Sequence, residues 1–323
     1  VFVLVQRIFD MQYHSSSSDL YPSVTQNSNS TPQFTESNLN LNLQDHAALN
    51  YTREEHEPFN FRSSITPEIF NDLVELFRPP RVGLLHVKAL TRVLKNVYKK
   101  FKDLPNIHDI TMPDTGKVTV VGDIHGQLED LLIILDEAGE PSPKNFIIFN
   151  GDFVDRGAYG FECVTLMFTM MAAYPEYVFL NRGNHEDMNV CCNYGFQREV
   201  YEKYDQLTFM LFVEIFKYIP LFSIINKAVF IVHGGLFHDE EVRLQDLLEI
   251  NRSDYEPVPP IPYPINCEDA DPAEQRKQKL KQLQRDALWS DPSAQVVDLA
   301  KNTRGAGVRD CLVSLSEDWC VYV

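Results

Sequence analysis

The sequence predicts an α/β fold in which helices cover the faces of a mostly parallel sheet. From Lys117 onward, apolar runs of strand type alternate with segments of helical spacing, an alternation that is typical of parallel sheets. Short polar runs that contain glycine follow the ends of four strand-type runs. Because ligands of such folds gather at the carboxyl ends of the strands, these polar runs predict a functional site at that edge.

Two helices are predicted ahead of the alternating region. Thr66-Pro67 supplies a capping hydroxyl followed by a proline at the first helical position, and the proline pair at 79–80 ends this first helix. Apolar side chains at helical spacing between Val87 and Phe101 predict a second, amphipathic helix. We expect both helices to pack against the domain that follows them.

The alternating region itself is predicted to contain strands over 117–121, 146–150, 178–181 and 228–231, with helices over 127–138 and 160–173. The apolar stretch Leu211–Val232 is interrupted by charged residues and by Pro220, so we expect a helix and a hairpin there and no membrane span. The charged stretch Glu274–Leu288 predicts a helix with a solvated face.

Composition excludes several classes of protein. The chain has 323 residues, enough for one large domain or two small ones, and its net charge of −17 argues against a general nucleic-acid binder and against binding to an anionic membrane. None of its six cysteines forms a Cys-x-x-Cys pair, so we expect reduced thiols and neither a zinc finger nor a disulfide framework. With no signal peptide recognised, we expect an intracellular protein, cytoplasmic or nuclear.

Two segments have biased composition. Residues 13–58 are dominated by Ser, Asn, Thr and Gln, which predicts a largely disordered N-terminal segment over 1–58. Pro257–Pro264 holds five prolines and predicts an extended loop inside an insertion over 251–276. A surface loop is the simpler interpretation of this loop, and docking of a regulatory protein on it is the alternative.

The four polar runs carry a metal-binding pattern. They supply, in chain order, Asp123, His125, Asp152, Asn184 and His233 from the ends of neighbouring strands. Such a set describes a two-metal hydrolytic site, in which two ions activate a water and bind a phosphoryl group. Carboxylate, carboxamide and imidazole donors without a thiolate suit manganese, iron or zinc. Each aspartate alone would be interpreted as a turn or cap residue, but five such residues in order favour a site.

These runs resemble the signature blocks of the phosphoprotein phosphatase family of serine/threonine phosphatases, over residues from about 60 to 307. Further blocks of the same resemblance are Tyr194-Gly195-Phe196, His233–Phe237 and Leu288–Pro292. The runs Phe149–Asp152 and Leu180–Asn184 resemble the branches that carry tetratricopeptide repeats or EF-hands (the retinal degeneration C type). The resemblance implies a metallophosphatase β-sandwich flanked by helices, of the calcineurin-like phosphoesterase type.

The resemblance also implies an organisation and an activity. Residues 59–104 would form a helical flank, 105–307 the catalytic domain, and 308–323 a divergent tail. The implied activity is that of a metal-dependent protein serine/threonine phosphatase, which hydrolyses phosphoserine and phosphothreonine in phosphoprotein substrates by attack of a metal-activated hydroxide. A calcium-loop pattern and tetratricopeptide repeats, the regulatory modules of the two branches, are not found in this sequence.

Each metal ligand receives a role by the same resemblance. Asp123 and His125 would bind the first metal, Asp152 would bridge both, and Asn184 and His233 would bind the second.

The remaining roles concern proton transfer and phosphate. His185 resembles the general acid that protonates the departing serine or threonine oxygen, with Asp155 on its other ring nitrogen. Arg156 and Arg304 resemble the two arginines that bind the substrate phosphate. Glu186 is expected to support the loop and to take no part in the chemistry.

The resemblance stops after Gly307. No histidine occurs after His238, so the family's remaining histidine ligand of the second metal is missing and occupancy of that site is doubtful. We expect a C-terminally truncated chain whose second sheet is incomplete and leaves an edge exposed. The alternative function is therefore a catalytically impaired isoform that binds phosphoproteins or acts as a regulatory module. A third hypothesis, a phosphoesterase for nucleotides or diesters, is disfavoured by the Tyr-Gly-Phe block.

Overall fold

The structure, a computed structural model, describes residues 64–80, 82–239, 241–254, 271–292, 300–301, 308–310 and 320–322. The predictions for the N-terminal segment 1–58, for the proline-rich run 257–264 and for Arg304 fall outside these residues.

One sheet is wholly parallel and has the strand order β2-β3-β4. Its strands are β2 (Lys117–Val121), β3 (Asn145–Asn150) and β4 (Val178–Asn181), which confirms three of the predicted strands. β3 is central and buried along its whole length, as a parallel strand covered on both faces should be. In register, Val121 pairs with Phe149 and Asn150 pairs with Asn181, so the polar runs begin at the same edge of the sheet.

The second sheet is mixed, with the order β1-β5-β6-β10. It contains β1 (Ile107–Ile110), the antiparallel hairpin of β5 (Phe222–Ile225) and β6 (Val229–Val232), and β10 (Cys320–Tyr322). The predicted hairpin is confirmed, whereas β1 was not predicted. β10 pairs with β6 in parallel, so β1 and β10 are the edge strands of this sheet. A small third sheet has the order β7-β9-β8, from β7 (Asp291–Pro292), β8 (Ala300–Lys301) and β9 (Val308–Asp310).

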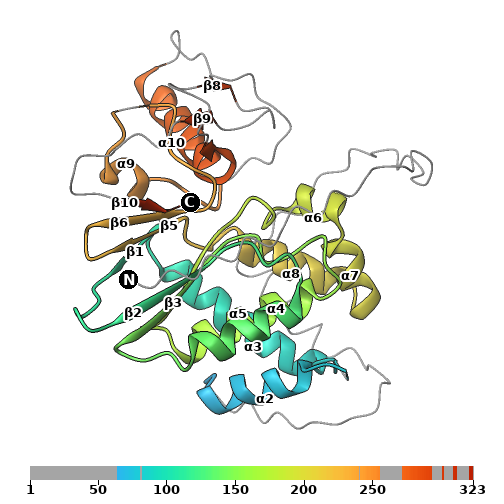
Figure 1. The fold of residues 1–323 in the computed structure, drawn as a ribbon. Helices are drawn as coiled ribbons and strands as arrows, with labels where there is room; N and C mark the ends of the chain where they lie inside the picture. Colours follow the sequence, from blue (N-terminus) through green and yellow to red (C-terminus); the bar gives the residue numbers. More distant parts are fainter. Residues whose placement is uncertain are drawn as a thin grey trace, which may run out of the picture.

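The first two sheets pack face to face. Alternate residues of β2 and β3, among them Val120 and Ile148, are buried in one cluster with Ile110, Ile225 and Ile231 of the mixed sheet. Because successive side chains of a strand point to opposite faces, the residues between them pack on the other side, under the helices. The result is a β-sandwich with helices outside it (Figure 1).

The helices on the parallel sheet form the larger core. They are α2 (Pro67–Phe77), α3 (Val87–Asp103), α4 (Leu128–Ala138), α5 (Gly160–Ala173) and α8 (Gln206–Phe216), and they confirm the predicted helices. α5 is buried on nearly all sides, since α2, α3 and α4 all contact it. Two shorter helices, α6 (Met188–Tyr194) and α7 (Phe196–Lys203), follow β4 and lie at the right of Figure 1.

The other side of the sandwich carries α9 (Leu244–Leu248) and α10 (Pro272–Trp289), at the top of Figure 1. The prediction of a solvated face along α10 is wrong for its C-terminal half, which is buried from Gln282 to Leu288. Its polar residues are paired there: Asp286 binds the His238 ring, and Gln284 donates to a backbone carbonyl at 3.1 Å. Within the part of the chain that the structure describes, none of the helices is long and apolar enough to cross a membrane.

Candidate functional site

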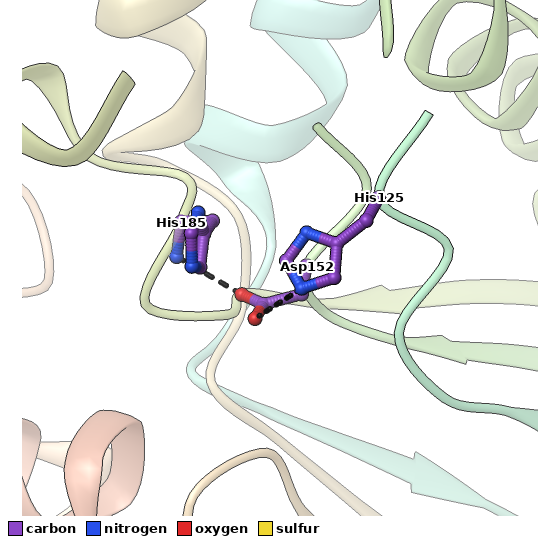
Figure 2. Close-up of side chains that lie close together, drawn as sticks. All are labelled: His125, Asp152 and His185. Carbon is purple, nitrogen blue, oxygen red and sulfur yellow. Dashed lines mark hydrogen bonds and ion pairs between the residues drawn. The ribbon is translucent and has the colours of Figure 1, made fainter. Parts of the chain in front are cut away.

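The polar runs meet at one edge of the sandwich. Those of the parallel sheet follow β2, β3 and β4, and the fourth follows β6 of the mixed sheet. Figure 2 shows the Asp152 carboxylate between the rings of His125 and His185. The structure thus brings together eight of the nine residues that the sequence nominates: Asp123, His125, Asp152, Asp155, Arg156, Asn184, His185 and His233.

The first donor group centres on His125. Its Nδ1 donates to the backbone carbonyl of Val154 at 2.8 Å, so Nε2 carries a lone pair. That Nε2 faces carboxylate oxygens of Asp152 at 3.4 Å and of Asp123 at 3.8 Å. It is buried and has no hydrogen-bond partner among the residues the structure describes. A buried lone pair aimed at two carboxylates is an arrangement that a cation between them would satisfy.

The second donor group centres on His233. Its Nδ1 donates to the Asn150 carbonyl at 2.8 Å, so Nε2 of this ring also carries a lone pair. Nε2 lies 3.4 Å from Asp152 Oδ1 and 3.1 Å from the amide oxygen of Asn184. In this arrangement three hydrogen-bond acceptors face one another: His233 Nε2, the Asp152 carboxylate and the Asn184 amide oxygen. With the Asn184 amide reversed, its NH2 would donate to both Asp152 oxygens at 3.0 and 3.1 Å, in the place that a cation would otherwise take.

These donors fit a pair of metal ions that share Asp152. Two groups offer one donor atom per residue with all atoms within 4.8 Å: His125, Asp152 and His185, and Asp123, Asp152 and His233. Hard oxygens mixed with imidazole nitrogens, without sulfur, are a donor set for divalent transition metals. Among the described residues, the predicted first site (Asp123, His125 and Asp152) and the predicted second site (Asp152, Asn184 and His233) have three donors each, fewer than a closed four-ligand site.

Protonation states favour metal binding at the centre. Burial lowers the pKa of His125 below its usual value despite the opposing charge of Asp152, which keeps the ring neutral. For Asp152, burial alone would raise the pKa, but His233, His185 and His125 together hold it below its usual value. A neutral imidazole and an ionised carboxylate are the forms in which these groups bind metal.

A histidine–aspartate pair lies beside the donors. His185 Nδ1 is 2.7 Å from Asp155 Oδ2, and the other Asp155 oxygen accepts the backbone N–H of Phe196 at 2.9 Å. Burial would lower the pKa of His185, but the hydrogen bond to Asp155 and the nearby carboxylates raise it above its usual value. The ring therefore holds a proton more firmly near neutral pH and can deliver it from Nε2.

The backbone of the site is strained. Left-handed φ angles occur at His125 (45°), Asp152 (54°), Asp155 (70°) and Arg156 (64°), a conformation that side chains other than glycine rarely adopt. Such residues persist only where surrounding contacts hold them, and they concentrate at functional sites.

Glu186 and two glycines hold this backbone. Buried Glu186 accepts the N–H groups of Asp152, Phe153 and Gly183 at 2.8–2.9 Å, the supporting position predicted for it. A Cβ on Gly151 (φ 94°) would lie 2.6 Å from the Gly183 backbone, so the two loops approach as closely as they do only because both residues lack one.

Arg156 is exposed at the mouth of the site, and its positive charge contributes to lowering the pKa of His125. Its side chain is therefore close to the donors and open to an anion. His238, the last histidine, does not take the place of a missing ligand: its ring Nδ1 is 2.6 Å from Asp286.

Sequence reasoning missed Glu199 and Lys203 on α7, which contact the segment after Arg156. The only sequence signal for this pair was the spacing of a glutamate four residues before a lysine.

Comparison with known proteins agrees with this geometry. Residues 116–307 match the family of calcineurin-like phosphoesterases. The chain is 39% identical over 241 residues to serine/threonine-protein phosphatase rdgC of Drosophila melanogaster, covering 73% of this chain and 35% of that protein. It is 37% identical over 231 residues to human serine/threonine-protein phosphatase 5, covering 72% and 42%. These relatives confirm the branch that the sequence indicated.

A solved structure is also similar. A protein serine/threonine phosphatase from Saccharomyces cerevisiae, described as similar to human phosphatase PP5, superposes with a TM-score of 0.61 at 28% identity and covers 75% of this chain and 70% of that one. The chain spans 35% and 42% of the length of these two curated relatives. Its fold, its donor set and the match over more than half its length make the chain a member of the calcineurin-like phosphoesterase family.

Proposed function

We propose that this chain is a metal-dependent phosphatase that hydrolyses phosphoserine and phosphothreonine in proteins. The observation that carries the proposal is the acceptor cluster around Asp152, with a histidine–aspartate pair beside it and an exposed arginine at its mouth. Relatives named serine/threonine-protein phosphatases support the substrate class.

In the proposed reaction, bound metal ions supply an activated water and neutralise charge on the phosphate. Arg156 binds phosphate oxygens through its planar fork of N–H donors. His185 donates its Nε2 proton to the serine or threonine oxygen as that group leaves. Asp155 keeps the other ring nitrogen protonated and fixes the orientation of the ring.

Manganese, iron or zinc are the proposed ions, since their preferences match these donors. Asp123, His125 and Asp152 would hold one ion. Asp152, Asn184 and His233 would hold the other, which we expect to bind more weakly because the uncharged Asn184 amide stands where the first site has a second carboxylate. Arg304 would be a second phosphate-binding residue.

The test is hydrolysis of a phosphoserine peptide by the manganese-loaded chain. His185→Asn removes the acid, and His86→Asn is the matched control because His86 lies at the start of α3, where asparagine can also cap the helix. We expect turnover by the wild type and the control, loss of it in His185→Asn, and loss of it on chelation. Equal turnover by both variants, or turnover that survives chelation, would contradict the proposal.

The second candidate function is a phosphoprotein-binding module without turnover. It is favoured by the low charge of the ligands assigned to the second metal site, where Asn184 and His233 are neutral and Asp152 is shared with the first site. Tight binding of the phosphopeptide by a folded, manganese-loaded wild type that releases no phosphate would establish this candidate in place of the first.

A further inference from the structure

The segment 155–161 carries both Asp155 and Arg156 into the site. Both residues have left-handed φ angles, of 70° and 64°, so the segment does not hold this shape by local preference. Contacts from outside must hold it, and they come from two sides.

The metal-binding loop after β2 supplies one side. Gly157 N–H donates to the His125 carbonyl at 2.9 Å, and Tyr159 N–H donates to the Gly126 carbonyl at 3.3 Å. A Cβ on Gly157 would collide with the His125 carbonyl, so the two backbones are in direct contact.

The region around α7 supplies the other side. Arg156 N–H donates to the Tyr194 carbonyl at 3.0 Å, and the first residue of α7, Phe196, donates its N–H to Asp155. One helix turn later, the Glu199 carboxylate accepts the N–H groups of Gly160 and Phe161 at 3.1 and 2.8 Å. Glu199 thus caps the first turn of α5 from outside.

Lys203, at the end of α7, completes this side. Its ammonium donates to the Ala158 carbonyl at 3.2 Å, to Glu199 at 2.7 Å and to the buried Glu162 at 2.5 Å. The Lys203 ammonium therefore links the Ala158 carbonyl, two residues after Arg156, to the carboxylates of Glu162 and Glu199. Both carboxylates are largely buried. Burial raises the pKa of Glu199 to about 7, although the charge and the hydrogen bond of Lys203 oppose that shift.

We propose that Glu199 and Lys203 are positioning residues for phosphate binding, which hold the 155–161 segment so that Arg156 faces the metal centre. This inference rests on the proposed function. Neither side chain reaches the donors around Asp152, so their effect is transmitted through the backbone of Ala158, Gly160 and Phe161 to Arg156.

The first measurement is calorimetric titration of the manganese-loaded full chain with inorganic phosphate. Lys203→Met should weaken phosphate binding about tenfold to a hundredfold, because a misplacement of about 1 Å can cost up to about a hundredfold. Lys203→Arg should restore most of the affinity because it keeps the charge and the donors. Lys217→Met is the matched control, since Lys217 binds Glu214 at 2.8 Å on α8 and is not among the contacts of the 155–161 segment.

The effect must also depend on Arg156. In an Arg156→Ala background, Lys203→Met should change the phosphate Kd little, because the residue that it positions is gone. Hydrogen exchange gives a readout that needs no metal: the Gly160 and Phe161 amides should lose protection in Lys203→Met while the amides of β3 keep theirs.

The outcomes separate the inference from the proposed function. An unchanged phosphate Kd in Lys203→Met, or a loss of the same size with and without Arg156, would overturn the inference. A wild type that binds phosphate without turnover would contradict the proposed function alone, and the inference would still be decided by the Kd values. A wild type that binds no phosphate would overturn both.

Discussion

Replacing Asp155 with asparagine tests the proton-donating role of His185, because it changes only the Asp155 oxygen that faces the His185 ring. In the variant, the asparagine oxygen can still accept the Phe196 N–H, as one Asp155 oxygen does in the wild type. The other position then carries an NH2 group, which faces His185 Nδ1 where a carboxylate oxygen lay at 2.7 Å. An imidazolium N–H cannot donate to that NH2, so the charged ring loses its partner and the pKa of His185 falls.

The size of the loss follows from the step that His185 performs. General acid catalysis contributes about 100-fold to 10,000-fold to a rate. We expect kcat for a phosphoserine peptide to fall by that range, because an alkoxide is a poor leaving group and needs the proton. For p-nitrophenyl phosphate, whose leaving group is stable without a proton, kcat should fall about tenfold or less.

The assay compares kcat for the two substrates in the manganese-loaded wild type and variant. Asp205→Asn is the control, because Asp205 also accepts a backbone N–H, at the start of α8, where asparagine is an equally good cap. An equal drop for both substrates would contradict the proton-donating role of His185, since it would indicate damage to metal or phosphate binding and no specific loss of the general acid.

Three further predictions concern core packing, the pH dependence of stability, and metal binding. Phe212→Ala should lower the free energy of unfolding by about 3–5 kcal/mol in a urea titration, because this fully buried ring packs against four other phenylalanine rings; a loss below about 1 kcal/mol would contradict the packing. The hydrogen bond to Asp286 raises the pKa of His238, so this pair stabilises the fold fully below pH about 6.5 and ceases to do so as pH rises through the folded-state pKa. His238→Gln should therefore destabilise the fold more at pH 6 than at pH 8, and a constant or reversed difference would refute the assignment. Gly183→Ala should abolish manganese binding at the donor cluster, because the added Cβ would collide with the backbone nitrogen and the carboxylate of Asp152; calorimetric binding like that of wild type would show that the loops can separate without cost.

The parallel sheet could be predicted because its strands are apolar runs that end in glycine and polar residues. β1 could not, because Ile107–Ile110 is four residues long with two polar residues in its middle, and its strand pairing depends on β5, more than 100 residues away. The buried half of α10 was missed for a similar reason. Its polar residues have a solvated composition, and only tertiary contacts such as the one between Asp286 and His238 make their burial possible.

The donor residues could be predicted from sequence because they follow strand ends directly, and the ends of adjacent parallel strands meet in space. Glu199 and Lys203 could not, because a glutamate and a lysine four residues apart on a helix are ordinarily a surface pair. Their contacts with the 155–161 segment depend on how α7 lies against α5, which local sequence does not specify.

Manganese binding measured by equilibrium dialysis decides whether Asp152 is a ligand shared by two metal ions. We expect the wild type to bind one ion tightly and a second more weakly. Asn184→Ala should lose the weaker ion alone, and Asp152→Asn should weaken both. Wild-type binding of both ions by folded Asp152→Asn would show that Asp152 is not a shared ligand.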